Sequence, residues 1–416
     1  MLDIKFIREN PDKIKDACQK KQVDCDIDRL LEVDKKRREL MQETENLKAE
    51  QNKISSQKDG DRKKAKELKE KIKTLEPELK KADKEYNKLM RLIPNPPLND
   101  VIKGKDEKEN KVLRQEGEKT KFSSKGGQGF KPKDYLEIAE KLDIIDVKRA
   151  AKVSGARFGY FKGGAALLEL ALIQLAFQNL TKKGFIPIIP PVMLNDRSMR
   201  GMGYLDRGVD EVYHLEKDNL YLAGTSEQSI GAMHIDEVFQ EEDLPKRYVG
   251  FSSCFRREAG AYGKDTRGIL RVHQFDKVEM FSFCKPEESQ KEHQLFLELE
   301  EKLMKELKIP YQVIDICSGD LGDSAAKKWD IEAWLPGQDK YRETHSTSNC
   351  TDWQARRLNI RYKNKDGIKF VHMLNGTIFA IGRIIIAIIE NYQQKDGTII
   401  VPEVLRQYMG GMKVIK

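Results

Sequence analysis

The sequence predicts an α+β protein in two parts: an N-terminal antiparallel two-helix coiled-coil arm, and a globular body built on an antiparallel sheet flanked by helices. Residues 28–93 are charged and helix-forming, and their apolar positions repeat every 3.5 residues. Beyond residue 220, strand-like runs alternate with turns, long connections and some helices, which favours an antiparallel sheet. Charged residues make up 35% of the chain, and so much charge requires the solvated surface of an extended element.

The arm is predicted from two apolar seams that advance by alternating steps of three and four residues. The first seam comprises Leu30, Val33, Arg37, Leu40, Thr44, Leu47, Gln51 and Ile54, and the second Ala65, Leu68, Ile72, Leu75, Leu79, Ala82, Tyr86, Leu89 and Ile93. The short turn at residues 58–61 permits only an antiparallel hairpin. Each helix would be about 45 Å long at 1.5 Å per residue. Pro77 lies inside the second seam, where we expect it to kink the helix.

Composition and helix-breaking residues predict three regions along the chain. The run Pro-Asn-Pro-Pro at residues 94–97 stops helix propagation, and the next forty or so residues are polar and glycine-rich. We therefore expect an N-terminal domain at 1–98, with the coiled coil at about 28–93, a linker with short strands at 99–134, and a globular domain at 135–416.

Within the globular domain the sequence predicts an apolar helix at 165–183, which ends at Gly184. The extended segment 185–192 carries three prolines, which confine it to a sheet edge or a subunit boundary. Further strands are predicted at 220–223, 248–256, 278–283 and 311–316, and helices at 287–307 and 377–392. Neither Gly-x-Gly-x-x-Gly nor Gly-x-x-x-x-Gly-Lys occurs in a strand–helix context, so neither common nucleotide-binding fold is indicated.

Bulk properties exclude several classes of protein. The six cysteines are scattered without a Cys-x-x-Cys pair, which argues against a disulfide framework and a structural zinc site. The N-terminus lacks an apolar signal region, and the most apolar run, 377–389, is short and interrupted by Arg383. The net charge of +8 leans only weakly toward an anionic partner. We expect a soluble cytoplasmic protein without zinc.

The candidate site begins with Arg256 and Glu258. On a strand the two side chains would share a face, with a guanidinium fork for a phosphate and a carboxylate to accept from an amino group. Phe275 and Glu279 would share a face in the same way. Such a sheet could hold a purine, a phosphate and an amino acid. An isolated Arg-x-Glu is usually a surface ion pair, but its ordered combination with residues 271–279 and 376–383 argues against that interpretation.

These passages resemble bacterial-type seryl-tRNA synthetases, which are class II aminoacyl-tRNA synthetases, and the resemblance runs from end to end. The matching passages are residues 184–191, 225–227, 254–260 with 265–268, 271–281, 320–322 with 327–332, 341–343, 348–350, 354–357, and 374–383 running into 390–392. The resemblance implies a six- or seven-stranded antiparallel sheet that bears the active site of a homodimer. Residues 165–191 would be the dimerisation element, and the helical hairpin would be the tRNA-binding arm.

The implied reaction is ATP-dependent attachment of L-serine to tRNA(Ser) through seryl-adenylate; whether tRNA(Sec) is also a substrate stays open. The first step needs no general base, because an α-carboxyl with a pKa of about 3.5 is already an ionised nucleophile at neutral pH. Catalysis should therefore come from positioning and from neutralising phosphate charge.

The resemblance also implies which residues bind ATP and Mg²⁺. Arg256 would bridge the α-phosphate and the serine carboxylate, and the purine would lie between Phe275 and Arg383. Arg256 and Arg383 would be the catalytic residues. The full ATP-binding set is Arg256, Arg257, Glu258 (beside the adenine amino group), Arg271, Val272, Phe275, Glu343, Thr344, His345, Ser346 and Arg383.

Glu343 and Ser346 would hold Mg²⁺ through hard oxygen ligands. Here the sequence departs from the family pattern, since the usual Glu-(Ile/Val)-Ser-Ser reads Glu343-Thr344-His345-Ser346. We interpret His345 as a hydrogen-bonding neighbour of the metal site and not as a ligand, because no second histidine or cysteine lies within three residues.

The implied serine-binding residues are Thr225, Ser226, Glu227, Arg256, Glu279, Asn375 and Thr377. Glu279 and Thr377 would face the serine hydroxyl, while Thr225 and Glu227 would serve the ammonium group. Alanine would be rejected because it leaves those buried groups unpaired, and threonine would be excluded by the size of the pocket.

Two alternatives stay open at the level of sequence. One is a structural or binding protein with an inactive synthetase-like body; serine-dependent ATP–pyrophosphate exchange would exclude it. The other is a synthetase-like ligase that loads amino acids onto a carrier protein. Such ligases lack the long arm, and charging of serine tRNA would exclude this alternative.

Overall fold

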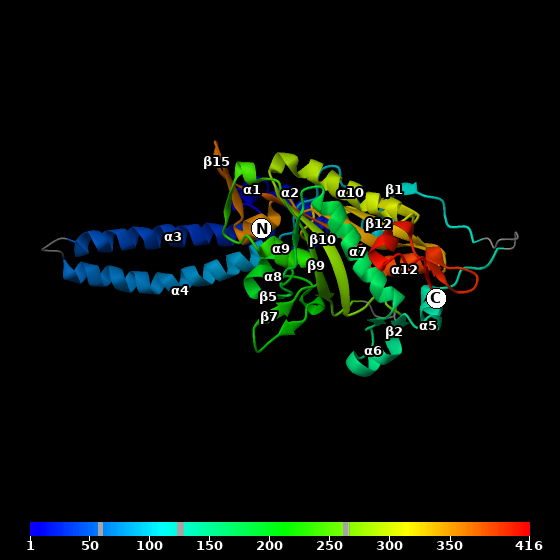
Figure 1. Ribbon diagram of the computed structural model, residues 1–416. Helices are drawn as coiled ribbons and strands as arrows, with labels where there is room; N and C mark the ends of the chain where they lie inside the picture. Colours follow the sequence, from blue (N-terminus) through cyan, green and yellow to red (C-terminus); the bar gives the residue numbers. More distant parts are fainter. Residues whose placement is uncertain (57–60, 123–128, 261–264, 266) are drawn as a thin grey trace. The chain divides into compact units, whose positions relative to one another are not determined.

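The computed structural model describes residues 1–56, 61–122, 129–260, 265 and 267–416. These residues form two compact units, Met1–Pro96 and Pro97–Lys416, coloured from blue to red along the chain in Figure 1. Most of the predicted turn at 58–61 and of the glycine-rich run at 126–129 lies outside the described residues. The same holds for Thr266 in the passage 265–268.

The first unit is helical. Its helices are α1 (Ile4–Glu9), α2 (Pro11–Lys20), α3 (Ile27–Ser55) and α4 (Arg62–Leu92). The Asp26 carboxylate accepts from the backbone N–H of Arg29 at the start of α3, and Asp61 accepts from the first turn of α4. These caps satisfy backbone donors that have no partner within the helix. The two long helices lie side by side and run in opposite directions (Figure 1).

The packing of α3 against α4 follows the predicted seams. Every predicted seam residue is buried or half-buried, which confirms the seams. Arg37 completes its layer by placing its guanidinium 4.7 Å from the centre of the Tyr86 ring while pairing with Asp83. Helix α4 continues through Pro77, so the proline does not end it.

The second unit is built on an eight-stranded sheet with the order β1-β11-β12-β13-β16-β10-β9-β4. Its strands are β1 (Lys111–Glu116), β4 (Ile186–Ile188), β9 (Lys246–Phe255), β10 (Gln274–Cys284), β11 (Tyr311–Asp315), β12 (Lys327–Leu335), β13 (Lys340–Asn349) and β16 (His372–Ala380). All neighbours are antiparallel except β4, which pairs parallel to β9 at one edge. The sheet is thus wider than the six or seven strands expected, because β1 adds to the other edge.

Alternation along β10 separates the two faces of this sheet. Val278, Met280 and Cys284 enter the main core, which also contains buried residues of α7 (Gly164–Thr181), α10 (Ser289–Glu306) and α12 (Ile381–Tyr392). Phe281 and Phe283 face the other way, into a second core with α9 (Ser226–Ala232) and α11 (Trp353–Leu358). Glu279 shares the parity of Phe281, so period-two alternation assigns it to this second face.

The remaining elements are short. The helices are α5 (Tyr135–Lys141), α6 (Val147–Ser154) and α8 (Asp196–Met202). Small sheets contain β2 (Ile145–Asp146) with β3 (Tyr160–Phe161); β5 (Met193–Asn195), β6 (His214–Leu215) and β7 (Leu220–Leu222); β8 (Val238–Gln240), β14 (Arg361–Asn364) and β15 (Gly367–Phe370); and β17 (Ile399–Ile400) with β18 (Val414–Ile415).

The helix predicted at 377–392 is wrong in its first turn. Residues up to Ala380 belong to β16, and α12 begins only at Ile381. Thr377 and Phe379 pair with β10, so tertiary pairing of β-branched and aromatic residues overrides the helical reading of the apolar run. The prediction also missed β12 and β13 as strands.

Two irregularities interrupt the central strands. Between β12 and β13, Ile331 pairs with His345 but Glu332 pairs with Glu343, so Thr344 is an extra, unpaired residue. Between β10 and β16, Val278 pairs with Phe379 but Glu279 pairs with Thr377, so Ile378 is extra. Both are β-bulges, which bend a strand and redirect the side chains around them.

Helix α7 is the one described helix whose length and composition would allow it to cross a membrane, with a mean hydropathy of 1.2 over 18 residues. Such a match is weak support for a span, because a core helix of a soluble protein passes the same criterion. Leu168, Leu172 and Leu175 of α7 are buried in the main core, whereas Leu167 and Leu170 are exposed.

Candidate active site

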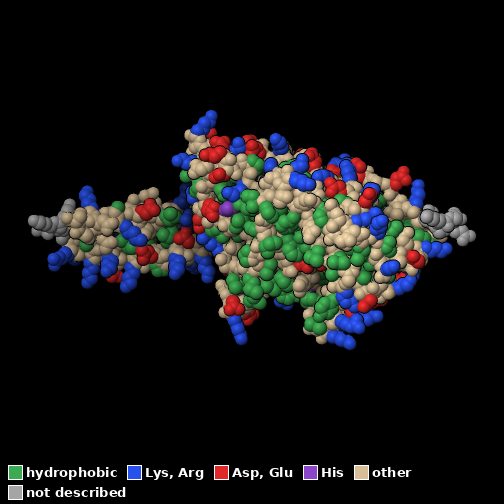
Figure 2. All heavy atoms as spheres, viewed as in Figure 1, with side chains coloured by type: hydrophobic (Ala, Val, Ile, Leu, Met, Phe, Trp, Pro, Cys, Tyr) green, Lys and Arg blue, Asp and Glu red, His purple; other side chains and the backbone are tan. Residues whose placement is uncertain are grey.

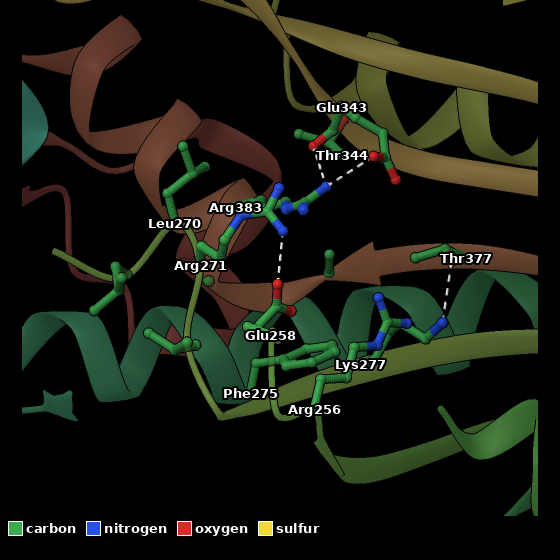
Figure 3. Close-up of a pocket in the computed structure, with 14 residues that line it drawn as sticks. Arg256, Glu258, Leu270, Arg271, Phe275, Lys277, Glu343, Thr344, Thr377 and Arg383 are labelled. Carbon is green, nitrogen blue, oxygen red and sulfur yellow. Dashed lines mark hydrogen bonds and ion pairs between the residues drawn. The ribbon is translucent and has the colours of Figure 1, made fainter. Parts of the chain in front are cut away.

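Connected cavities open on the face of the sheet to which Glu279 belongs. A cavity of about 530 Å³ is lined by Glu227, Glu279, Ser346, Asn375 and Thr377, among others. A second cavity of about 110 Å³ is lined by Glu258, Arg271, Val272, Phe275, Thr344 and Arg383. Arg256, Lys277, Glu343 and Thr377, which are labelled in the view of the smaller cavity in Figure 3, line both cavities, so the two are parts of one site.

Arg256 and Phe275 come from neighbouring strands of the sheet. Arg256 follows β9 directly, and its Nε donates to the carbonyl oxygen of Gly224 at 3.1 Å. Its guanidinium carbon lies 5.2 Å from the centre of the Phe275 ring on β10. An arginine held over an aromatic face gains cation–π attraction and offers its remaining donors to the cavity.

The strand geometry predicted for Arg256 and Glu258 is wrong. Strand β9 ends at Phe255, and Glu258 adopts a left-handed backbone conformation with φ 51°. The two side chains still line the same cavity, because the turn carries Glu258 toward Arg271. Arg271 Nη1 and Glu258 Oε2 are 2.6 Å apart, as shown by a dashed line in Figure 3.

Arg383 and Glu343 form the opposite wall. Arg383, in the first turn of α12, lies 3.2 Å from Glu343 Oε2 and donates to the Glu343 carbonyl oxygen at 2.9 Å (Figure 3). Burial by itself would raise the pKa of Glu343, but Arg383 and Lys328 outweigh it and hold that pKa at about 2. Glu343 is therefore an ionised oxygen donor at neutral pH.

Glu343 and Ser346 fit a hard divalent cation. Residues three apart on a regular strand point to opposite faces, but the bulge at Thr344 lets both side chains line the larger cavity. A carboxylate and a hydroxyl oxygen are ligands that Mg²⁺ accepts while it keeps waters and phosphate oxygens as its other ligands. The described residues contain no group of three or more His, Cys, Asp or Glu side chains placed to hold a metal.

An ion pair on the neighbouring strand lies beside these two residues, and its half-buried lysine lines the same larger cavity. Lys328 Nζ and Asp330 Oδ2 are 3.3 Å apart on β12, and Asp330 is the strand partner of Ser346. Burial raises the pKa of Asp330 to about 6 against the opposing effect of Lys328.

The other end of the larger cavity carries a compact polar cluster of Lys277, Glu279 and Thr377. Lys277 Nζ lies 2.7 Å from Glu279 Oε2, and the Thr377 hydroxyl donates to the same carboxylate oxygen at 3.3 Å. Lys277 Nζ also donates to Thr377 Oγ1 at 3.4 Å. Burial raises the pKa of Glu279, and the ammonium group of Lys277 opposes that rise. A small hydroxyl compound placed here would meet both a donor and an acceptor.

Thr225 and Glu227 lie at the start of α9. The Thr225 side chain caps this helix by accepting from the Glu227 N–H at 3.4 Å. Glu227 lines the larger cavity, and its Oε1 accepts from the Tyr204 hydroxyl at 2.6 Å. Thr225 lines a neighbouring cavity of about 500 Å³ together with Arg256, Glu258 and Arg383.

Three expected site residues do not line any of these cavities. Arg257 points to Tyr213, whose ring centre is 5.8 Å from its guanidinium carbon. Ser226 is fully buried, and its hydroxyl has no hydrogen-bond partner among the described residues. His345 is buried beside Phe379; its Nδ1 lies 2.8 Å from Thr344 Oγ1, and burial lowers its pKa to about 3.

The sequence reasoning missed several polar residues in or beside the larger cavity, among them Tyr204, Lys277 and Lys328, which line it, and Asp330, the ion-pair partner of Lys328. Lys277 had an available signal, since period-two alternation places it on one face with Phe275 and Glu279. Asp330 alternates with Lys328 in the same way. Tyr204 follows a short helix, and nothing in its local sequence indicates a contact with Glu227.

Comparisons with known proteins agree with this geometry. A family model described as the seryl-tRNA synthetase N-terminal domain matches residues 1–97, and one described as the tRNA synthetase class II core domain (G, H, P, S and T) matches residues 211–392. The serine–tRNA ligase of Streptomyces coelicolor is 46% identical over 425 residues, covering 100% of this chain and 99% of that protein. The serine–tRNA ligase of Dictyoglomus thermophilum is 48% identical, covering 99% of this chain and 98% of that protein.

Solved structures give the same result. Seryl-tRNA synthetase from Pyrococcus horikoshii, complexed with ATP, matches with a TM-score of 0.91 and 41% identity over 100% of this chain and 99% of that chain. Cytoplasmic serine–tRNA ligase from Naegleria fowleri, in complex with AMP, matches with a TM-score of 0.88 and 36% identity over the same shares. Prolyl-tRNA synthetase from Giardia lamblia, 17% identical with a TM-score of 0.57, shares the fold alone.

The antiparallel sheet, with a site lined from β10, β13, β16 and the start of α12, has the architecture of a class II aminoacyl-tRNA synthetase core. Within that class the full-length matches decide the family. The chain belongs to the seryl-tRNA synthetase family, the serine–tRNA ligases. The predicted fold class, family and enzyme class are confirmed.

Proposed function

We propose that this chain attaches L-serine to tRNA(Ser) through a seryl-adenylate, with Arg256 and Arg383 as the catalytic residues. The observation that carries the proposal is the larger cavity, in which Arg256 and Glu343 lie in the same lining as Glu279, Asn375 and Thr377. One cavity thus offers a guanidinium to a phosphate and a donor–acceptor pair to a hydroxyl.

In the first step, an oxygen of the ionised serine carboxylate attacks the α-phosphorus of ATP. A new P–O bond forms to that oxygen, the bond to the bridging oxygen breaks, and pyrophosphate leaves with the electron pair. Arg256 neutralises the α-phosphate and the carboxylate as they approach, and Arg383 neutralises the phosphate tail. Phe275 and Arg383 contact the two faces of the purine, and Glu258 accepts from its amino group. Arg271, Val272 and Thr344 complete the nucleotide site.

Glu343 and Ser346 would hold Mg²⁺, which enzymes of this class use generally with ATP. The cation would supply additional neutralisation of phosphate charge. Glu343 suits this role because its pKa is held at about 2, so its carboxylate is already ionised at neutral pH before ATP binds. The buried His345 does not line the larger cavity and is a neighbour of the metal site, not a ligand. Arg257 and Ser226, which do not line the cavities, would act only through the loop and helix that they occupy.

Serine is recognised through its hydroxyl and its ammonium group. Glu279 and Thr377 offer an acceptor and a hydroxyl to the serine side chain, and Asn375 lines the same space. Alanine would leave these buried groups without partners, which costs more than the loss of an apolar contact. Glu227 and Thr225 would accept from the ammonium group.

In the second step, a terminal ribose hydroxyl of the tRNA attacks the seryl carbonyl carbon. An ester bond forms, the bond to the phosphate oxygen breaks, and AMP leaves. We propose that the helices within residues 28–93 bind the long extra arm of tRNA(Ser) by shape and charge, and that residues 135–416 form the catalytic domain. The linker would occupy 99–134. Charging of tRNA(Sec) is a separate proposal that the same arm would serve.

We also propose a cytoplasmic homodimer. Exposed apolar side chains on α7 and beside β4, namely Leu167, Leu170, Ile186, Ile189 and Met193, support a subunit interface. Figure 2 shows hydrophobic side chains gathered over the part of this face where Figure 1 labels α7. Sedimentation of the wild type and of Ile189→Glu tests the dimer, because a charge at this 73% exposed position would disfavour burial against a second subunit.

Serine-dependent ATP–pyrophosphate exchange followed by charging of tRNA(Ser) tests the proposed function. Exchange with serine and at least tenfold weaker exchange with alanine and threonine are expected, followed by stable seryl-tRNA. Exchange that does not depend on serine would refute the assignment. Exchange without charging would separate adenylate chemistry from tRNA recognition.

A further inference from the structure

Tyr204 is held rigidly at the edge of the larger cavity. It follows α8, and its N–H donates to the Met199 carbonyl oxygen at 3.0 Å. The preceding Gly203 has φ 95°, and a Cβ at that position would lie 2.7 Å from the Trp353 ring. The position therefore requires glycine, and the close approach to Trp353 fixes the path of the chain into Tyr204.

The ring and the hydroxyl of Tyr204 have different surroundings. The ring packs against two buried apolar clusters, one containing Met199 and Tyr221 and the other Ile230 and Phe281. The hydroxyl donates to Glu227 Oε1 at 2.6 Å, a short distance typical of an O–H group bonded to a carboxylate. Burial and the Glu227 carboxylate raise the pKa of Tyr204 well above 10, so the hydroxyl remains a donor throughout the working pH range.

We infer that Tyr204 is a positioning residue that fixes Glu227 as the acceptor for the ammonium group of the amino-acid substrate. The inference rests on the proposed serine site, and it adds a residue to which neither the sequence reasoning nor the comparisons gave a role. A glutamate side chain has three rotatable bonds and loses affinity if it must be ordered when substrate binds. The packed ring of Tyr204 holds its hydroxyl in place, and the hydrogen bond from this hydroxyl orders the Glu227 side chain before substrate binds.

The Glu227 carboxylate can accept hydrogen bonds from Tyr204 and from an ammonium group at the same time. A carboxylate has acceptor sites on both oxygens, and Tyr204 occupies one of those on Oε1. In the part of the chain that the structure describes, Oε2 and the remaining site on Oε1 are available to an ammonium group in the cavity that Glu227 lines. Without the Tyr204 hydroxyl the carboxylate can rotate, and the substrate has to restrict it on binding.

Tyr204→Phe isolates this contact, because it removes the hydroxyl and keeps the packed ring. We expect the KM for serine in ATP–pyrophosphate exchange to rise about tenfold or more, as is usual for loss of a hydrogen bond to a charged group. The exchange kcat and the KM for ATP should change less than threefold. L-Glycerate, which carries a hydroxyl where serine has its ammonium group, should keep its inhibition constant within twofold.

The comparison of serine with L-glycerate separates positioning of Glu227 from a general structural effect. If Tyr204→Phe weakened both compounds by the same factor, or changed neither, the inference would be overturned. Tyr221→Phe is the matched control: Tyr221 lies in one of the same apolar clusters but is not among the described residues that line the cavity. It should leave both constants unchanged. Absence of serine-dependent exchange in the wild type would instead refute the proposed function.

Discussion

Replacing Thr377 by valine tests how the protein recognises the hydroxyl group of serine. Valine keeps the branched shape of threonine and removes the oxygen that donates to Glu279 at 3.3 Å and accepts from Lys277 at 3.4 Å. Thr377 is 7% exposed, so water does not readily replace the lost group. Lys277 and Glu279 remain paired at 2.7 Å, and this ion pair should hold the pocket together in the variant.

The magnitude follows from these contacts. The lost hydroxyl would bond both a carboxylate partner and the serine side chain, and hydrogen bonds to charged groups contribute about 1.5–3 kcal/mol. At about 1.4 kcal/mol per factor of ten, kcat/KM for serine should fall roughly 10- to 150-fold. Alanine has no hydroxyl to lose, so its kcat/KM should change less than about threefold. The variant should therefore lose between about threefold and about 150-fold of its preference for serine over alanine.

The assay is ATP–pyrophosphate exchange with serine and with alanine for the wild type, Thr377→Val and Thr347→Val. Thr347 is a matched control because it is also buried, donates to the Asn375 carbonyl oxygen at 3.1 Å, and is not among the described residues lining the larger cavity. Thr347→Val should lower stability without changing the ratio of serine to alanine. An equal loss of serine and alanine activation in Thr377→Val would refute the role of this hydroxyl.

Three further predictions concern other parts of the molecule. Arg256→Ala should slow single-turnover adenylate formation by about 10²–10³-fold through loss of charge neutralisation, and a rate within tenfold of the wild type would exclude the proposed role. Replacing residues 28–93 by a short linker should preserve serine-dependent exchange and abolish tRNA charging. Binding of tRNA by the full chain should weaken steeply as the salt concentration rises. Normal charging without the arm, or binding that does not depend on salt, would contradict this prediction. Glu300 is fully buried, and neither carboxylate oxygen has a hydrogen-bond partner among the described residues, so burial raises its pKa well above the usual value. In the folded protein Glu300 keeps its proton to a higher pH than in the unfolded chain, so its contribution to stability is full below about pH 4 and is lost as pH rises toward the folded pKa. In urea unfolding, Glu300→Gln should therefore gain stability relative to the wild type from pH 5 to pH 8. Parallel pH profiles of the two proteins would contradict this prediction.

Periodicity predicted the arm well because each of its two long helices buries one row of mainly apolar side chains that repeats every 3.5 residues. Leu30, Leu40, Leu68 and Ile72 are buried as the 3.5-residue repeat requires. Strand alternation pointed to Arg256 and Glu279, but the roles of the site residues came from the resemblance, since Arg256, Glu279 and Arg383 converge only when three separate segments fold together. Short-range patterns carry no information about such convergence.

The predictions failed where tertiary pairing competes with local preference. The apolar run from Thr377 reads as a helix, yet its first residues are held in β16 by the β10 ladder. Tyr204 was missed because its partner, Glu227, lies 23 residues away in the chain. Lys277 differs, since its ion-pair partner Glu279 lies on the same strand and alternation places both side chains on one face. A side chain that acts only through a distant neighbour leaves no mark on its own local sequence.

The bulge at Thr344 has a consequence for protein design. The spacing Glu-x-x-Ser suits a shared cation only on a backbone with one extra residue, because a regular strand would turn Glu343 and Ser346 to opposite faces. A designer who grafts this tetrapeptide onto an ideal β-ladder would bury one oxygen ligand behind the sheet. The graft must either carry the bulge with it or shorten the spacing to Glu-x-Ser.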